Sequence, residues 1–385
     1  MDFLPGNRID LLTNGEEYFP ALLTAIDAAS VEVCIETYIF QNDVTGRKVV
    51  AALVRAAQRG VVVRVMVDGF GASGFLPNFG AELAAARVDV RVYRPEVARF
   101  RIRRHRLRRL HRKLVTIDGR IGFVGGINII DDMDTPGQIP PRHDYAVRIE
   151  GPLLASIHDS MQRLWHLVSW ASFRRRRTDL RRVRAVATSA CGNVAAAFLI
   201  RDNLRHRHEI EDAYLAAIDG ARHEILIANA YFLPGRRFRQ ALMAAAERGV
   251  NVTLLLQGRV EYMLLHYATQ ALYGALLGAG IHIHEYRRGF LHAKVAVVDG
   301  AWATVGSSNI DPFSLLLARE ANVVVKNAAF AADLLDNLRQ TMQAGAEEIR
   351  KDAWKKKALP RRIASWLSYS LVRLMIGLSG YGGKH

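Results

Sequence analysis

The sequence predicts an α/β fold built from two similar halves that pack face to face. Strand-like and helix-like segments alternate along the chain, which is typical of sheets flanked by helices. The pattern also occurs twice, since QRGVVVRVMVDG (58–69) resembles ERGVNVTLLLQG (247–258) and HRKLVTIDG (111–119) resembles HAKVAVVDG (292–300). Half of the 385 residues are hydrophobic, which is enough for a sizeable core. A duplicated α/β unit accounts for all three observations.

In the first half, the β-branched run VEVCIETYIF (31–40) predicts a strand. The segment GRKVVAALVRAAQRG (46–60) predicts a helix that ends at its glycine. The apolar run VVVRVMV (61–67) predicts a buried strand, and LVTID (114–118) predicts another strand that turns at the next glycine.

The second half repeats this order. EILIANAYFL (224–233) predicts a strand, and RRFRQALMAAAERG (236–249) predicts a helix that again ends at a glycine. VTLLLQ (252–257) and VAVVD (295–299) complete the set as predicted strands.

Three segments follow: a first repeat at 1–175, a second repeat at 185–345 and a tail at 346–385. The predicted boundary between the repeats lies near 172–190, where FRRRRTDLRRVR (173–184) is charged and has little periodicity. The net charge of +16 comes from 53 basic and 37 acidic residues. A surplus of this size favours polyanionic partners, meaning nucleic acid or an anionic membrane surface.

Composition also excludes several classes of protein. Two cysteines, Cys34 and Cys191, provide neither a disulfide framework nor a zinc pattern. The N-terminus has no basic region followed by an apolar stretch, so no signal peptide is expected. No run of about 20 apolar residues occurs, so no transmembrane helix is expected and the chemistry is expected to face the cytoplasm.

Both repeats carry the spacing H-x-K-x4-D. The motif residues are His111, Lys113 and Asp118 in the first repeat and His292, Lys294 and Asp299 in the second. Residues two apart on a strand point to the same face, so each histidine is expected beside a lysine. This combination places a nucleophile or proton carrier next to a positive charge that suits a phosphate oxygen.

The sequence G-x-x-N follows each motif at the same distance and ends at Asn128 or Asn309. A duplicated core needs its apolar residues, but it needs no histidine, lysine or asparagine at these positions. Retention of all three therefore favours a shared chemical role over a merely copied strand and turn.

The paired motifs resemble those of the phospholipase D superfamily, and the resemblance covers nearly all of residues 6–345. It implies two α/β/α halves, each with a mixed sheet flanked by helices, packed with pseudo-two-fold symmetry. Segments such as ETYIFQNDVTGRKV, HDYAVRIEGP and GSSNIDPFSLLLAREANVVV are similar to the bacterial cardiolipin synthases, especially the shorter type without N-terminal transmembrane helices.

The resemblance also implies a mechanism. One histidine, His111 by analogy, attacks phosphorus to form a phosphohistidine, while His292 protonates the leaving alcohol and later deprotonates the incoming one. The motifs are symmetrical, so the sequence by itself does not assign these roles. Four side chains are expected to hold the non-bridging oxygens: Lys113, Lys294, Asn128 and Asn309. Neither a metal ion nor a cofactor is implied.

The superfamily also has acidic residues that hold the two histidines. Glu320 and Asp144 match them, and they lie 28 positions after His292 and 33 positions after His111, respectively. The longer gap accommodates DDMDTPGQIP (131–140), whose acidic residues are interpreted as a solvated loop rather than a metal site. The motif aspartates, Asp118 and Asp299, are expected to brace the motif loops.

These observations favour a phosphatidyltransferase that passes a phosphatidyl group from phosphatidylglycerol to a second phospholipid, which yields cardiolipin and releases glycerol. Hydrolysis of the phospholipase D type is the nearest alternative. A superfamily nuclease is compatible with the charge of +16, although the flanking segments and the tail argue against nucleic acid. A non-catalytic membrane adaptor is disfavoured because neither repeat has lost a motif residue.

The expected partners are anionic phospholipids and a membrane surface, with the protein peripheral on the cytoplasmic side of a bacterial cell membrane. The run ARFRIRRHRLRRLHRK (98–113) is interpreted as a basic lip that gathers anionic head groups. In the tail, a basic cluster at 355–362 precedes an apolar stripe, which predicts an interfacial helix or a helix docked on the protein's own core. The stripe comprises Ile363, Trp366, Leu367, Leu371, Leu374 and Leu378.

Overall fold

The computed structural model describes residues 1–95, 108–135, 137–171, 186, 189–202, 206–260, 262–311, 318–355 and 359–376. The predicted boundary segment at 173–184 lies outside these residues, as does most of the predicted basic lip at 98–113.

The first half contains the elements from β1 to α4. Their bounds are β1 Leu4–Thr13, α1 Asn14–Asp27, β2 Glu32–Thr37, α2 Val44–Gln58, β3 Val62–Asp68, α3 Phe75–Ala85, β4 Asp89–Tyr93, β5 Arg109–Leu110, β6 Lys113–Ile117, β7 Ile121–Gly125, β8 Ile139–His143, β9 Tyr145–Glu150 and α4 Leu153–Ala171.

The second half contains the elements from β10 to α9, and the tail adds three more. Their bounds are β10 Val194–Arg201, α5 Glu209–Gly220, β11 Glu224–Asn229, α6 Arg236–Glu247, β12 Asn251–Gln257, α7 Met263–Gly278, β13 His282–Tyr286, β14 Gly289–Leu291, β15 Lys294–Val298, β16 Trp302–Gly306, β17 Ala318–Lys326, α9 Ala328–Gly345, β18 Ala346–Glu348, α10 Lys351–Lys355 and α11 Leu359–Ile376.

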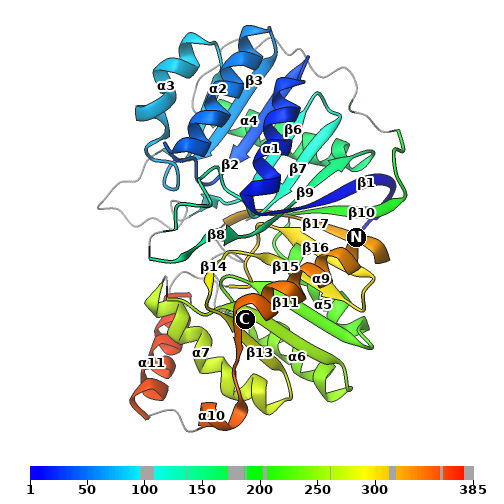
Figure 1. Ribbon diagram of the computed structural model, residues 1–385, viewed down its shortest axis with the longest axis vertical. Helices are drawn as coiled ribbons and strands as arrows, with labels where there is room; N and C mark the ends of the chain where they lie inside the picture. The colour runs from blue at the N-terminus through cyan, green and yellow to red at the C-terminus, as the bar shows by residue number, and fades with distance from the viewer. Residues whose placement is uncertain are drawn as a thin grey trace.

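The two halves have the same strand order, which confirms the predicted fold class. The first sheet runs β1-β9-β7-β6-β2-β3-β4 and the second runs β10-β17-β16-β15-β11-β12-β13. In each sheet the last three strands are parallel to one another and the others pair antiparallel, so both sheets are mixed. Edge strands β1 and β10 pair antiparallel and join the halves, which lie one above the other in Figure 1.

Helices cover both faces of each sheet. Residues of α1, α2 and α3 form one apolar cluster with the first sheet, and residues of α5, α6 and α7 form another with the second. A third cluster contains residues of α4 and α9 together with strands of both sheets. The two halves therefore share one of their apolar cores.

The predicted elements are found with two differences in extent. Both first strands are shorter than expected, because β2 ends at Thr37 and β11 at Asn229. The chain then leaves the sheet, and Phe40 and Phe232 make isolated parallel bridges to Ile129 and Ile310. These bends carry the residues that follow each strand toward the space between the halves.

The tail forms part of the second half. Strand β18 pairs with β13 at the edge of the sheet, and α11 packs along α7, as Figure 1 shows. Val372 of α11 is fully buried in the core of this half, while other apolar side chains of the same helix are exposed. Among the described helices, none is long and apolar enough to cross a bilayer.

Candidate active site

Each motif histidine lies immediately before a strand and not within it, because β6 begins at Lys113 and β15 at Lys294. The main-chain N–H of His111 donates to the carbonyl oxygen of Arg319 at 3.0 Å. That of His292 donates to the carbonyl oxygen of His143 at 2.7 Å. Both acceptors belong to the opposite half, so the backbone holds each histidine against the other repeat.

The two histidine–carboxylate pairs also cross between the halves. His111 Nδ1 lies 3.0 Å from Glu320 Oε1, and His292 Nδ1 lies 2.6 Å from Asp144 Oδ2. The sequence spacing counted each carboxylate from the histidine of its own repeat and assigned no pairing, whereas in the structure each carboxylate contacts the histidine of the other repeat. The crossing arises because β5 pairs with β17 and β14 pairs with β8, just before each carboxylate.

This arrangement defines which ring nitrogen of each histidine can react. A carboxylate at Nδ1 accepts the Nδ1 hydrogen, and it leaves the lone pair on Nε2 in the neutral ring. Burial lowers the pKa of His111, and burial together with the nearby Lys294 lowers the pKa of His292 to about 3. Both rings are therefore neutral at neutral pH, and the lone pair on each Nε2 is available.

The two motif lysines are buried beside the histidines. Lys113 Nζ donates to the carbonyl oxygen of His111 at 2.6 Å, and Lys294 Nζ donates to that of His292. Burial, opposed by Glu320 and reinforced by Lys294, lowers the pKa of Lys113 to about 7. The lysines of the two halves influence each other's environment, so both motifs contribute to a single site.

Small residues leave space for the carboxylates. A Cβ on Gly126 would lie 2.3 Å from Asp144 Oδ1, so only glycine fits without displacing this carboxylate. At the equivalent position of the second half, Ser307 donates its hydroxyl to Glu320 Oε2 at 2.5 Å. Burial opposes ionisation of Asp144, but Lys294 and His292 reverse this effect, and its pKa is lowered.

The structure does not bring the motif aspartates to the histidines. Asp118 and Asp299 have positive φ values of 53° and 49° in the turns that follow β6 and β15. Their carboxylates accept main-chain N–H groups at the start of the neighbouring strand, including those of Glu32 and Glu224. These bonds attach each motif hairpin to the first strand of its half.

The two asparagines are buried behind the site. Asn128 Oδ1 accepts the main-chain N–H of Ile39 at 3.1 Å, which leaves its Nδ2 group as the donor for a ligand. Asn309 is 3% exposed in the second half. In the neighbouring strand, Asn229 Oδ1 accepts the main-chain N–H of Ile310.

Two aromatic side chains beside the histidines were missed in the sequence. The ring of Tyr38 lies 4.9 Å from that of His111 and 5.6 Å from Lys113 Nζ. The ring of Phe290 stacks on His292 at 5.9 Å. Tyr38 was hidden because it lies inside the first predicted strand (31–40), whereas β2 ends at Thr37 and the chain leaves the sheet at Tyr38.

The acidic loop at 131–134 has a structural role in the first half. Asp132 Oδ2 accepts the main-chain N–H of Gly15 at 2.8 Å, near the start of α1. Within the described ranges, no group of three histidine, cysteine, aspartate or glutamate side chains is arranged to hold a metal ion.

Comparison with known proteins identifies the family. The family model "Cardiolipin synthase, PLD-like domain" matches residues 22–165 and 214–342. The chain belongs to this family. This cardiolipin synthase family member is 39% identical to cardiolipin synthase B of Escherichia coli strain K12. The match covers 99% of this chain and 91% of the Escherichia coli protein.

More distant relatives agree with this assignment. Cardiolipin synthase 1 of Bacillus cereus is 29% identical to this chain. The match covers 92% of this chain and 70% of the Bacillus cereus protein. The crystal structure of phosphatidylserine synthase from Haemophilus influenzae Rd KW20 superposes with a TM-score of 0.71 at 13% identity, covering 98% of this chain and 95% of that one. The fold is therefore shared across very different sequences.

Proposed function

We propose that this protein is a cardiolipin synthase that transfers a phosphatidyl group from phosphatidylglycerol to a second phospholipid and releases glycerol. The main support is the pair of crossed histidine–carboxylate contacts, which hold two histidines from opposite halves through Nδ1 and leave each Nε2 to react. In-line displacement at phosphorus requires a nucleophile on one side and a proton donor on the other. Similarity to cardiolipin synthase B over 99% of the chain supports the choice of lipid substrate.

In the first step, Nε2 of His111 attacks phosphorus and the bond to the glycerol oxygen breaks. Glu320 holds Nδ1–H and balances the positive charge that develops on the ring. His292 Nε2 donates a proton to the departing oxygen. A bound phosphodiester brings a negative charge beside His292, which favours protonation of its ring.

In the second step, the hydroxyl of another phospholipid attacks the phosphohistidine. Its proton passes to His292 Nε2, its oxygen bonds to phosphorus, and the bond between phosphorus and His111 breaks. Lys113 and Lys294 offset the charge on the non-bridging oxygens, and the Nδ2 groups of Asn128 and Asn309 are proposed as further donors.

The proposed site of action is the cytoplasmic face of a bacterial membrane, with α11 as the docking element. Six apolar side chains of this helix are 44–64% exposed: Ile363, Trp366, Leu367, Leu371, Leu374 and Met375. Lysines and arginines precede and interrupt this stripe in the sequence, and basic residues are attracted to anionic lipids. The same helix covers α7, whose first residue, Met263, is 65% exposed.

Purified protein given vesicles of phosphatidylglycerol with a labelled phosphatidyl group tests this function. Labelled cardiolipin and free glycerol are expected, and both should be absent with His111→Ala. Phosphatidic acid as the only product would show a hydrolase. Cleavage of a nucleic-acid diester without turnover of lipid would show a nuclease and would contradict the proposal.

A further inference from the structure

The two halves differ at one position beside the motif histidines. In the first half Glu36 lies opposite Leu114, so the next residue, Thr37, is level with the motif lysine Lys113. In the second half Asn229 lies opposite the motif lysine Lys294, so Thr37 and Asn229 are equivalent positions. Ala230 in the second half therefore occupies the position that Tyr38 occupies in the first half. The Tyr38 ring covers one side of His111, whereas a methyl group leaves the corresponding space in the second half open.

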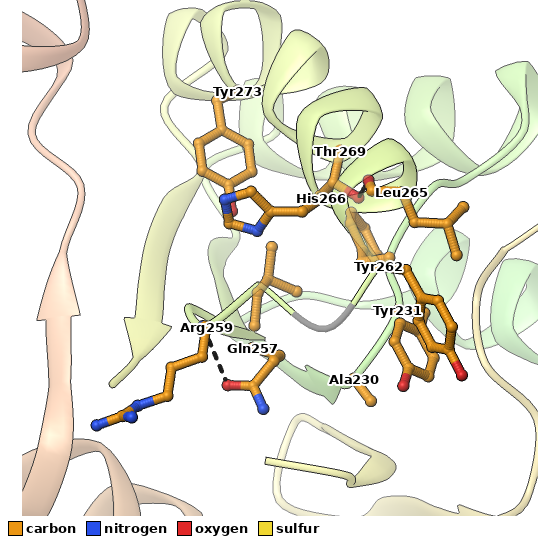
Figure 2. A pocket seen from close by; sticks show the side chains of 11 residues that line it. Ala230, Tyr231, Gln257, Arg259, Tyr262, Leu265, His266, Thr269 and Tyr273 are labelled. Atoms are coloured by element: carbon orange, nitrogen blue, oxygen red, sulfur yellow. Dashed lines mark hydrogen bonds between the residues drawn. The ribbon is translucent and has the colours of Figure 1, made fainter. Parts of the chain in front are cut away.

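A cavity of about 30 Å³ lies in that space, between the ends of β11 and β12 and the start of α7 (Figure 2). A volume of this size holds roughly two water-sized groups. Its lining combines polar, aromatic and aliphatic side chains. The residues are Ala230, Tyr231, Phe232, Leu256, Gln257, Arg259, Tyr262, Leu265, His266, Thr269 and Tyr273.

One polar group in this wall is buried without a partner. Gln257 is 8% exposed, and its Nε2 donates no hydrogen bond within the part of the chain that the structure describes. Its Oε1 accepts the main-chain N–H of Arg259 at 3.3 Å. A buried amide donor left unsatisfied is destabilising, so a ligand with an acceptor oxygen would be favoured here.

The first half shows that this donor is not required by the fold. The equivalent position there is Asp68, whose carboxylate accepts the main-chain N–H groups of Phe70, Gly71 and Leu110. Asp68 is thus fully used to hold the segment before His111. Gln257 has one bond of this kind and directs its other group to the cavity.

The cavity favours a neutral ligand. Among its described lining residues, Arg259 is the only one with a permanent charge, and its guanidinium donates to the carbonyl oxygens of Arg287 and Gly137. Figure 2 shows this side chain pointing away from the other lining residues. His266 Nε2 is 3.0 Å from Gln270 Nε2. Hydroxyl groups suit these surroundings better than a phosphate does.

The cavity also lies beside the reacting groups. The main-chain N–H of Ala230 donates to the carbonyl oxygen of Ala293, the residue that follows His292. From the other wall, Tyr262 is close enough to the Tyr38 hydroxyl to influence its ionisation. Two residues of the cavity wall, Ala230 and Tyr262, therefore lie next to the segments that carry the motif histidines.

We propose that this cavity binds the free hydroxyl groups of a glycerol head group, with Gln257 Nε2 as a donor, and so selects glycerol-bearing alcohols for transfer. The inference rests on the proposed phosphatidyl transfer and deepens it. The bound alcohol would place its reacting hydroxyl near His292. In the transfer step the bond from phosphorus to His111 Nε2 breaks, the bond from phosphorus to the alcohol oxygen forms, and the alcohol proton moves to His292.

The test compares two small acceptors that differ only in hydroxyl groups. Full-length protein with phosphatidylglycerol vesicles is given labelled glycerol or labelled 1-propanol, and kcat/KM is measured for the appearance of labelled lipid. The specificity ratio of glycerol to 1-propanol is the readout, because a general structural defect lowers both rates alike. Gln257→Leu and Ala230→Tyr are the test variants. Gln240→Leu, at an exposed position of α6 outside the cavity lining, is the matched control.

Loss of one hydrogen bond is expected to lower the ratio about tenfold in Gln257→Leu, and filling the cavity should lower it in Ala230→Tyr as well. The control should keep the wild-type ratio. An unchanged ratio in both variants would overturn the assignment of the cavity. Wild-type protein that releases phosphatidic acid and labels no lipid with either alcohol would instead show that transfer itself is absent, and both proposals would fail.

Discussion

His111 and Glu320 are 209 positions apart in the sequence, yet His111 Nδ1 lies 3.0 Å from Glu320 Oε1. Each repeat thus supplies a histidine to one dyad and a carboxylate to the other. Neither repeat holds a complete dyad by itself. The shared core between α4, α9 and both sheets is therefore a requirement of the chemistry as well as of stability.

The crossed pairing predicts that the two carboxylates affect different events of the first step, Glu320 the attack on phosphorus and Asp144 the protonation of the leaving group. Glu320→Gln should slow formation of the phosphohistidine by roughly 10²–10⁴-fold, because the ring loses its negative partner as it becomes positively charged. The effect should be the same with phosphatidylglycerol and with a phosphatidyl p-nitrophenyl ester. The measurement is the single-turnover rate with each substrate.

Asp144→Asn is the matched comparison. His292 must protonate a glycerol leaving group, but p-nitrophenol leaves without a proton. Asp144→Asn should therefore slow the reaction of phosphatidylglycerol much more than that of the p-nitrophenyl ester. Equal losses on both substrates in both variants would show that the roles of the histidines are not divided in this way.

The pKa of Lys113 predicts a decline of activity in mildly alkaline solution. Its pKa is lowered to about 7 by burial, so Lys113 carries a charge below pH 7 and loses it as the pH rises above 7. The positive charge that binds the lipid phosphate is then lost, and kcat/KM for the free enzyme should fall. On the acidic side, burial lowers the pKa of His111, so the nucleophile should become protonated only at a lower pH than an ordinary histidine.

Lys113→Arg tests this explanation, because a guanidinium stays charged throughout the range. The alkaline fall in kcat/KM should move to higher pH in this variant, even if its maximum rate is lower. Lys326→Arg, at the exposed end of β17, should retain the wild-type profile. An alkaline fall at the same pH in Lys113→Arg would assign the titration to another group.

A buried ion pair behind the first motif predicts non-additive effects on stability. Arg112 Nε and Nη2 donate to Glu36 at 2.5 and 3.0 Å, and both side chains are 3% exposed. In the second half the equivalent residues are Ala293 and Ala228. Removing one partner leaves a buried charge, so Arg112→Ala should lower the free energy of unfolding by about 3–5 kcal/mol.

The double variant Arg112→Ala, Glu36→Ala copies the second half and removes both charges. It should lose less stability than the sum of the two single variants, as measured by urea unfolding. Strict additivity would mean that the two side chains stabilise the fold independently, despite their contact.

The sequence was sufficient to find the repeat, the order of the predicted elements along the chain and the paired histidine and lysine motifs, because these depend on local periodicity and spacing. It could not predict the partner of each histidine, because that depends on the pairing of β5 with β17 and β14 with β8 across the halves. The difference between Tyr38 and Ala230 was also hidden. These positions are 192 apart while the motifs are 181 apart, so only the strand register aligns them.

The tail shows a further limit of sequence reasoning. Its apolar stripe predicted either an interfacial helix or a helix docked on the core, and α11 has both kinds of surface. Val372 packs into the core of the second half, while Trp366 and Leu374 are 64% and 59% exposed. Because the docked face is separate from the exposed face, the exposed face can be altered without undocking the helix.

This separation allows a direct test of membrane docking. Trp366→Glu together with Leu374→Glu should weaken binding to phosphatidylglycerol vesicles at least about tenfold, since burial of one large apolar side chain contributes roughly 1.5–3 kcal/mol and the new charges are repelled by the lipid. Vesicle sedimentation measures the change. Trp170→Glu is the control, because Trp170 is 73% exposed at the end of α4 in the other half. Equal binding by the double variant and wild type would exclude α11 as the docking element, whereas equal weakening by Trp170→Glu would point to a response to charge rather than to a specific surface.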